Sequence, residues 1–283
     1  MALILNTNIS SLTAQRNLSR STGALATSFK RLSSGLRINS AADDAAGLSI
    51  SSRMTSQING LNQAVRNAND AISLVQISEG ALTETTTALQ RMRELAVQAA
   101  NDSNVSSDRT DMQKEVNQLV AEISRIANTT QFNTQNLLSG GASAGLTFQV
   151  GAKENQTITV SITNMRASAL GVDSGVMNSF GFGATASANQ AAAESAIARI
   201  DKAINSVSYT RATLGAMQNR FDAVIANLTN VSLNTSQARS RITDVDMAAE
   251  TANMTQNSIL QQAGTAILAQ ANQQPSLILQ LLK

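Results

Sequence analysis

Apolar residues recur every three or four positions over long stretches of the chain. In the first stretch the spacing alternates between four and three, which is typical of a helix with one buried face. These positions are Ile50, Met54, Ile58, Leu61, Val65, Ala68, Ile72, Val75, Leu82 and Leu89. The pattern predicts one helix over residues 44–100, which would measure roughly 85 Å.

Two later stretches repeat this spacing. One predicts a helix over 107–128, where Asp108 and Asp111 suit a helix start, after a turn at 101–104. The other predicts a helix that resumes at Ile197. Their apolar positions are Met112, Val116, Leu119, Ile123 and Ile126, then Ile200, Ile204, Val207, Leu214, Met217, Phe221, Val224, Leu228 and Val231.

The segment between them has a different character. Glycines cluster at its start, and apolar and polar residues alternate over 157–162. A stretch rich in Gly, Ala and Ser follows at 180–188. We expect short strands or a hairpin, then a loop.

Both chain ends carry apolar residues at helical spacing and almost no charge. Near the start these residues are Leu18, Leu25, Phe29, Leu32 and Leu36. Residues 1–15 and 251–282 contain no charged side chain, which is unusual for a solvated helix. We therefore expect a mainly α fold: a long antiparallel helical bundle or coiled coil formed by both chain ends, with a small β-hairpin region in the middle. We also expect residues 1 to about 40, and the tail from 251 to 282, to be largely disordered in the soluble chain and helical only on polymerisation.

Composition narrows the possible chemistry. The 283 residues include no His, Cys or Trp and few aromatic residues. This excludes a Ser-His-Asp or Cys-His nucleophile pair, a thiolate zinc site and a disulfide, and it favours thin helical seams over an aromatic core. The net charge is +2, with +5 over residues 1–66 and −4 over 67–138, so nucleic-acid binding is not indicated. We expect no catalytic, cofactor or metal site.

Two acidic clusters have structural explanations. Asp43 and Asp44 precede the first long predicted helix, so helix capping is preferred over metal binding. The second cluster comprises Asp244, Asp246 and Glu250. There Thr243 and Asp246 resemble a variant capping box, with metal binding as the alternative.

Three other features favour a simple interpretation. Residues 181–186 match a dinucleotide-binding pattern, but no buried strand precedes them, so a loop is preferred. From the residue types alone, we interpret Arg91 and Arg93, with Glu94, as a solvated charge patch. No secretory signal peptide and no transmembrane helix is expected, because the apolar runs are too short.

Longer motifs resemble bacterial flagellin. NTNISSL at 6–12 and RLSSGLRINSAADDAAGL at 31–48 are similar to its N-terminal core. RITDVDMAAE at 241–250 and the closing segment from QQAG at 261–264 are similar to its C-terminal core. The resemblance covers roughly residues 1–138 and 195–283.

This resemblance implies a filament protein of a swimming bacterium, exported unfolded through the flagellar type III channel. Residues 1–43 and 242–283 would form the inner tube. Residues 44–241 would form the next shell, with a small β and loop insertion at about 139–194. The implied partners are other subunits, an export chaperone, and the filament cap and hook-junction proteins.

The resemblance also names candidate residues. Those similar to the segment read by the vertebrate Toll-like receptor for flagellin are Leu89, Gln90, Arg91, Arg93, Glu94, Leu95 and Glu115. The polymerisation ends would use Leu18, Leu25, Phe29, Leu32, Leu36, Ile259, Leu260, Ile267, Leu268, Leu277, Leu279, Leu281 and Leu282. The alternatives are a coiled-coil secreted effector, a hook-junction protein, and an enzyme, which would need a metal-binding triad.

Overall fold

The computed structural model describes residues 7–178 and 186–281, and the surroundings of side chains within 7–177 and 192–273. The chain divides into two compact units, one of residues 1–58 with 233–283 and one of residues 59–232. The division at 43 and 242 implied by the resemblance concerns shells of a filament, so it stays a prediction.

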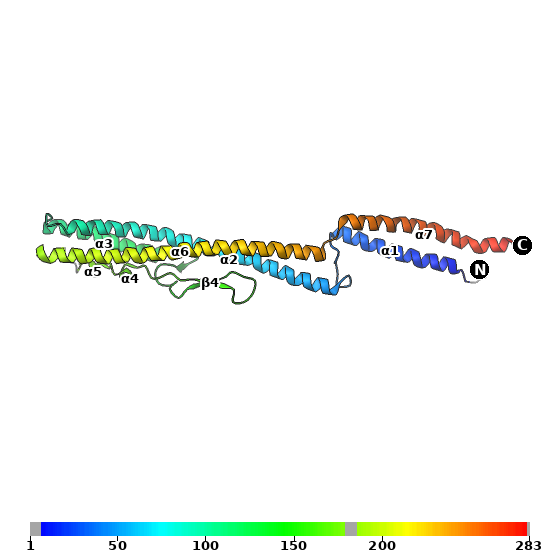
Figure 1. The fold of residues 1–283 in the computed structure, drawn as a ribbon, viewed down its shortest axis with the longest axis horizontal. Helices are drawn as coiled ribbons and strands as arrows, with labels where there is room; N and C mark the ends of the chain where they lie inside the picture. The colour runs from blue at the N-terminus through cyan, green and yellow to red at the C-terminus, as the bar shows by residue number, and fades with distance from the viewer. Residues whose placement is uncertain (1–6, 179–185, 282–283) are drawn as a thin grey trace. The chain divides into compact units, whose positions relative to one another are not determined.

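The fold is mainly α, as predicted, and helices make up most of the described residues. The helices in Figure 1 are α1 (Ile9–Ser34), α2 (Ala45–Ala99), α3 (Ser106–Thr129), α4 (Ala167–Leu170), α5 (Ser174–Asn178), α6 (Ala186–Thr243) and α7 (Met247–Leu281). The predicted helices at 44–100 and 107–128 are confirmed to within one residue at each end. Helix α6 begins at Ala186, earlier than expected, because its alanine-rich first turns favour a helix without large apolar residues.

Four short strands form two antiparallel pairs. Strand β1 (Gln131–Phe132) pairs with β2 (Gln135–Asn136), and β3 (Leu146–Gln149) pairs with β4 (Thr157–Val160). The β4 strand confirms the alternation seen in the sequence. The β1–β2 turn places its two central residues at positive φ, 45° for Asn133 and 66° for Thr134.

The unit of residues 59–232 has a continuous apolar core. Leu82 and Leu89 of α2, Ile123 of α3 and Phe221 of α6 are all fully buried in it, as their spacing predicts. The β3–β4 pair contributes Phe148, whose ring stands edge-on to that of Phe221 at a centroid distance of 6.1 Å. The core is therefore more aromatic than the composition suggested, because two of the six phenylalanines meet in it.

The predicted turn at 101–104 is confirmed, and a buried arginine supports it. Arg109 is 3% exposed and donates from Nη2 to the carbonyl oxygen of Asn101 at 3.2 Å. The side-chain amide of Asn104 donates to the carbonyl of Gln98 at 2.6 Å. These side-chain donors add to the backbone hydrogen bonds that the same two carbonyl groups accept from the N–H groups of Asn101 and Asn104.

Candidate functional site

Helices α1 and α7 pack against each other, as predicted, and run antiparallel in the unit of residues 1–58 and 233–283 (Figure 1). Their less exposed residues recur at alternating spacings of three and four, as in a coiled-coil seam. On α1 these are Ser11, Ala14, Leu18, Ser21, Leu25, Ser28 and Leu32, and on α7 they are Glu250, Met254, Asn257, Gln261, Gly264, Leu268 and Ala271. The seam is thin, because nine of these fourteen side chains are small or polar.

Polar contacts close the seam near both of its ends. The side-chain amide of Asn8 donates to the carbonyl of Ala271 at 2.7 Å, and the hydroxyl of Ser11 donates to Oδ1 of Asn272 at 2.6 Å. Near the other end, Nη1 of Arg31 lies 3.7 Å from Oε2 of Glu250.

Large apolar side chains project away from the seam. Phe29 is 67% exposed, Ile259 is 60% exposed and Ile267 is 57% exposed. Of the five apolar residues at helical spacing near the start of the chain, only Leu18, Leu25 and Leu32 lie in the seam. Phe29 lies outside the seam, and Leu36 lies beyond the end of α1. Ile9, Leu12 and Leu260 are also exposed, whereas Leu277, Leu279, Leu281 and Leu282 have side chains outside the described set.

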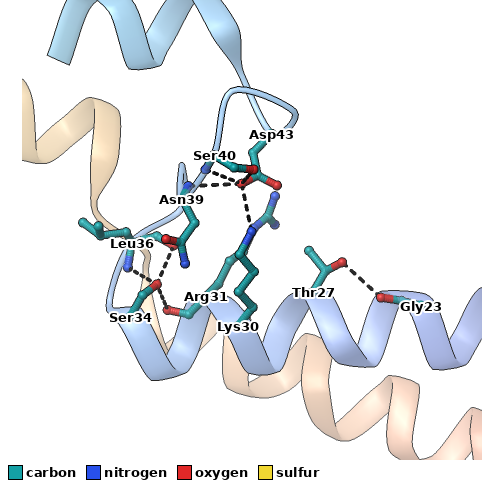
Figure 2. Close-up of polar contacts among 9 residues, drawn as sticks. All are labelled: Gly23, Thr27, Lys30, Arg31, Ser34, Leu36, Asn39, Ser40 and Asp43. Atoms are coloured by element: carbon teal, nitrogen blue, oxygen red, sulfur yellow. Dashed lines mark hydrogen bonds and ion pairs between the residues drawn. The ribbon is translucent and has the colours of Figure 1, made fainter. Parts of the chain in front are cut away.

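The loop after α1 is closed by Asp43 (Figure 2). Its Oδ2 accepts hydrogen bonds from the backbone N–H of Asn39 at 3.1 Å, from that of Ser40 at 2.9 Å and from the Ser40 hydroxyl at 2.9 Å. Nζ of Lys30 lies 3.7 Å away. These donors, the Ser40 hydroxyl first, hold the pKa of Asp43 below its ordinary value. Gly35 ends α1 at a φ of 70°, which a residue without Cβ adopts freely.

A short backbone bridge joins the segment after α1 to the segment before α7. The N–H of Arg37 donates to the carbonyl of Thr243 at 2.6 Å, and the N–H of Val245 donates to that of Gly35 at 3.1 Å. Asp244 between them accepts from the hydroxyls of Ser240 and Thr243 at 2.5 and 2.8 Å. These two hydrogen bonds lower the pKa of Asp244.

Both acidic clusters act in capping. Oδ1 of Asp44 accepts from the N–H of Gly47 at 2.9 Å at the start of α2, which confirms the predicted cap. At α7 the cap is Asp246, whose Oδ1 accepts from the N–H groups of Ala248 and Ala249. The capping box begun by Thr243 is wrong, since Thr243 still belongs to α6 and Asp246 precedes α7.

The alternatives of a metal or nucleotide site gain no support. Among the described residues, no group of three or more acidic side chains is placed to hold a metal ion. The dinucleotide-like pattern falls on 181–186, almost entirely outside the described residues. In the described part of the chain, no helix combines the length and apolar character needed to span a membrane.

The second predicted site lies on α2 and α3, in the unit of residues 59–232. Nε of Arg91 lies 2.9 Å from Oε1 of Glu115, and its Nη1 lies 3.0 Å from Oε2 of Glu94. Both carboxylates, Glu115 first, raise the pKa of Arg91. Arg93 pairs instead with Asp201 of α6 at 2.7 Å, a contact that the sequence did not suggest.

Arg91, Glu94 and Glu115 are exposed, whereas the neighbouring leucines are buried. Leu89 is fully buried and Leu95 is 2% exposed, because both belong to the core-facing stripe of α2. Their side chains therefore offer almost no surface to a partner of the folded unit, and their part in recognition stays a prediction. Gln90 is exposed beside them.

Comparison with known proteins identifies the chain's relatives. The bacterial flagellin N-terminal helical region matches residues 5–143, and the bacterial flagellin C-terminal helical region matches residues 197–282. A flagellin of Halalkalibacterium halodurans is 47% identical over 281 residues, which cover 99% of this chain and all of that protein. A flagellin of Bacillus subtilis is 44% identical over 302 residues, which cover 99% of this chain and 99% of that protein. The flagellar filament 33 kDa core protein of Treponema phagedenis is 44% identical over 291 residues, which cover 99% of this chain and all of that protein. The chain therefore belongs to the bacterial flagellin family, whose members are structural subunits of the flagellar filament and not enzymes.

Proposed function

We propose that this flagellin polymerises through the outward-facing apolar residues of α1 and α7. The observation that carries the proposal is the exposure of Phe29, Ile259 and Ile267 on a pair of helices whose own seam is thin. Burying one such side chain fully contributes about 1.5–3 kcal/mol, and neighbouring subunits are the surface available for it in a filament. Residues 1–43 and 242–283 would then form the inner tube, with 44–241 outside it.

The lack of charge supports the same role for the C-terminal helix. Helix α7 contains one charged residue, Glu250, and that residue is buried. Its exposed surface therefore presents Gln, Asn, Ser and Thr among the apolar residues, and these groups can enter an interface without burying a charge. A helix that only faced water would gain from charged side chains on its outer side.

Export is the second part of the proposal. The chain would leave the cell unfolded through the flagellar type III channel, with a chaperone on its C-terminal segment, and would be secreted to the growing filament tip. The absence of cysteine supports this route, because no disulfide has to form or break on the way. The cap and hook-junction proteins would be its further partners.

Recognition by the vertebrate Toll-like receptor for flagellin is a proposal for the charged surface on α2 and α3. Gln90, Arg91, Glu94 and Glu115 would contact the receptor through exposed polar atoms, with Arg93 beside them. Leu89 and Leu95 would support that surface from the core.

Polymerisation is tested with substitutions that leave the seam unchanged. We expect the triple variant Phe29→Ser, Ile259→Ser, Ile267→Ser to stay soluble and to form no filaments after salting-out, as seen by electron microscopy. Deletion of residues 251–283 should have the same effect. Tyr209→Ser is the matched control, because Tyr209 is 77% exposed on α6 in the other unit, and it should still polymerise. Filaments formed by the triple variant as readily as by the parent chain would overturn the proposal.

A further inference from the structure

The apolar pattern of the seam does not by itself fix which α1 residue faces which α7 residue. Leucines recur one heptad apart on α1, and so do small residues. These positions are Leu18, Leu25 and Leu32, and Ala14, Ser21 and Ser28. Sliding α1 along α7 by one heptad, about 10 Å, would again place leucines and small residues in the seam. In coiled coils a polar or charged residue within the seam removes this ambiguity.

One ion pair joins α1 to α7 among the described residues, and it reaches from Arg31, next to Leu32 at the edge of the seam, to the seam residue Glu250. Nη1 of Arg31 is 3.7 Å from Oε2 of Glu250, and Glu250 is 7% exposed. The side chain of Arg31 is 32% exposed, although its Nε is buried and has no hydrogen-bond partner among the described residues. The Glu250 carboxylate is therefore withdrawn from water and depends on Arg31 for a cation.

A slipped pair would separate these charges. Moving α1 by one heptad would bring Ala24 opposite Glu250 in place of Arg31. The carboxylate would then lose its partner at that level, because α7 carries no basic residue and the nearest cation of α1, Arg20, lies a full helical turn from Ala24. Leaving one member of a buried pair without its partner is strongly destabilising.

We infer that Arg31 and Glu250 set the register of the terminal helix pair. The backbone bridge at Gly35, Arg37, Thr243 and Val245 holds the chain segments between the helices. The ion pair carries that alignment into the seam itself. Lys30, the preceding residue, pairs instead with Asp43 of the loop (Figure 2), so two adjacent cations near the end of α1 contact two different segments.

The consequence for assembly rests on the proposed function. Phe29 on α1 and Ile259 on α7 belong to one polymerisation surface only if the two helices keep their alignment. A slip of one heptad would displace one set of apolar residues against the other by about 10 Å.

Introduced cysteines can report the register directly, since the chain has none of its own. Ser11→Cys with Asn272→Cys reports the observed register, because these two side chains touch. Ser11→Cys with Thr265→Cys reports the register slipped by one heptad. Each full-length soluble variant is treated with a short bifunctional thiol reagent, which captures the helix pair even where that pair forms only transiently. The yield of cross-linked product is divided by the yield from the same variant in denaturant. We expect the observed register to exceed the slipped one by about tenfold.

Three further variants test the role of the charges. Glu250→Gln should bring the ratio of the two yields close to one, and the exchange Arg31→Glu with Glu250→Arg should restore the parent ratio. Lys30→Gln is the matched control, because its pair with Asp43 has the same 3.7 Å separation outside the seam, and it should leave the ratio unchanged. An unchanged ratio in Glu250→Gln, a ratio near one in the parent chain, or a failed restoration would each overturn the inference. Because the yields come from the soluble chain, the result is separate from any failure to polymerise.

Discussion

Leu18 of α1 packs against Gly264 of α7, with its Cδ1 3.4 Å from the point that a Cβ on residue 264 would occupy. The two helices can therefore approach closely at this level of the seam. The space at position 264 admits about one methyl group, so a small and a large side chain there should have opposite effects on stability.

Gly264→Ala should stabilise the terminal helix pair. The added methyl group meets Leu18 at ordinary van der Waals distance, and alanine favours a helix interior by about 1 kcal/mol over glycine. Thermal unfolding of the filament followed by circular dichroism should show a higher midpoint. Gly264→Leu should lower it, because the larger side chain forces Leu18 away. A lower midpoint for the alanine variant would show that the helices are closer than the structure describes.

Acid should weaken the region between α1 and α7. The pKa values of Asp43 and Asp244 are lowered from 3.8 by hydrogen bonds to their charged forms. A carboxyl group whose folded pKa is lowered contributes stability that is present above its unfolded pKa and lost as the pH falls through the folded pKa. Urea unfolding at neutral pH should therefore show a smaller free energy of unfolding for Asp43→Asn, Asp244→Asn than for the parent chain.

The difference between these two proteins should shrink once the pH falls well below 3.8, where the parent carboxyl groups also become neutral. Glu122→Gln is the matched control. It removes a carboxyl group of the other unit whose pKa is likewise lowered, in this case by Arg125. An equal difference at neutral and acidic pH would contradict the assignment of stability to the two aspartates.

Thr134 occupies an unfavourable backbone conformation in the β1–β2 turn. Its φ is 66°, and a β-branched residue is rarely found there. Thr134→Gly should raise the free energy of unfolding by about 1 kcal/mol, because a tight hairpin turn with positive φ at both central residues favours glycine. Asn133→Gly should change it less, since asparagine tolerates this region. A loss of stability in Thr134→Gly would mean that the side chain makes a contact that outweighs the strain.

Receptor activation should depend on the charged surface of α2 and α3. Arg91→Ala removes the group that holds Glu94 and Glu115 together, so the soluble protein should activate cells carrying the receptor less strongly than the parent. Arg125→Ala is a suitable control, because its exposed pair with Glu122 lies on α3 beyond Glu115 and involves none of the proposed contact residues. Intact filaments should not activate the receptor. Full signalling by Arg91→Ala would count against this site.

Periodicity predicted the helices of this protein well, because long helices repeat the same local signal many times. The same signal placed Leu89 in the buried stripe of α2, whereas only the family resemblance named it as a contact. Where the two disagreed, the burial observed for Leu89 and Leu95 followed the periodicity.

Contacts between distant parts of the chain could not be predicted in this way. Arg31 with Glu250 and Arg93 with Asp201 join residues whose proximity depends on which helices pair and in what register. The seam itself was partly hidden because Ala14, Ser21 and Ser28 carry little apolar signal, while the more apolar Phe29 faces outward. The cap at Asp246 was misassigned because the sequence pattern did not show that Thr243 still belongs to α6.

Amide hydrogen exchange on the soluble chain and on the filament tests the central claim, that α1 and α7 are stabilised by neighbouring subunits. Ordering a residue costs roughly 1–2 kcal/mol, and the thin seam offsets little of that cost in one chain. We predict fast exchange throughout α1 and α7 in the soluble protein, slow exchange in the core helices of residues 59–232, and strong protection of α1 and α7 after polymerisation. Strong protection of α1 and α7 already in the soluble protein would contradict the account.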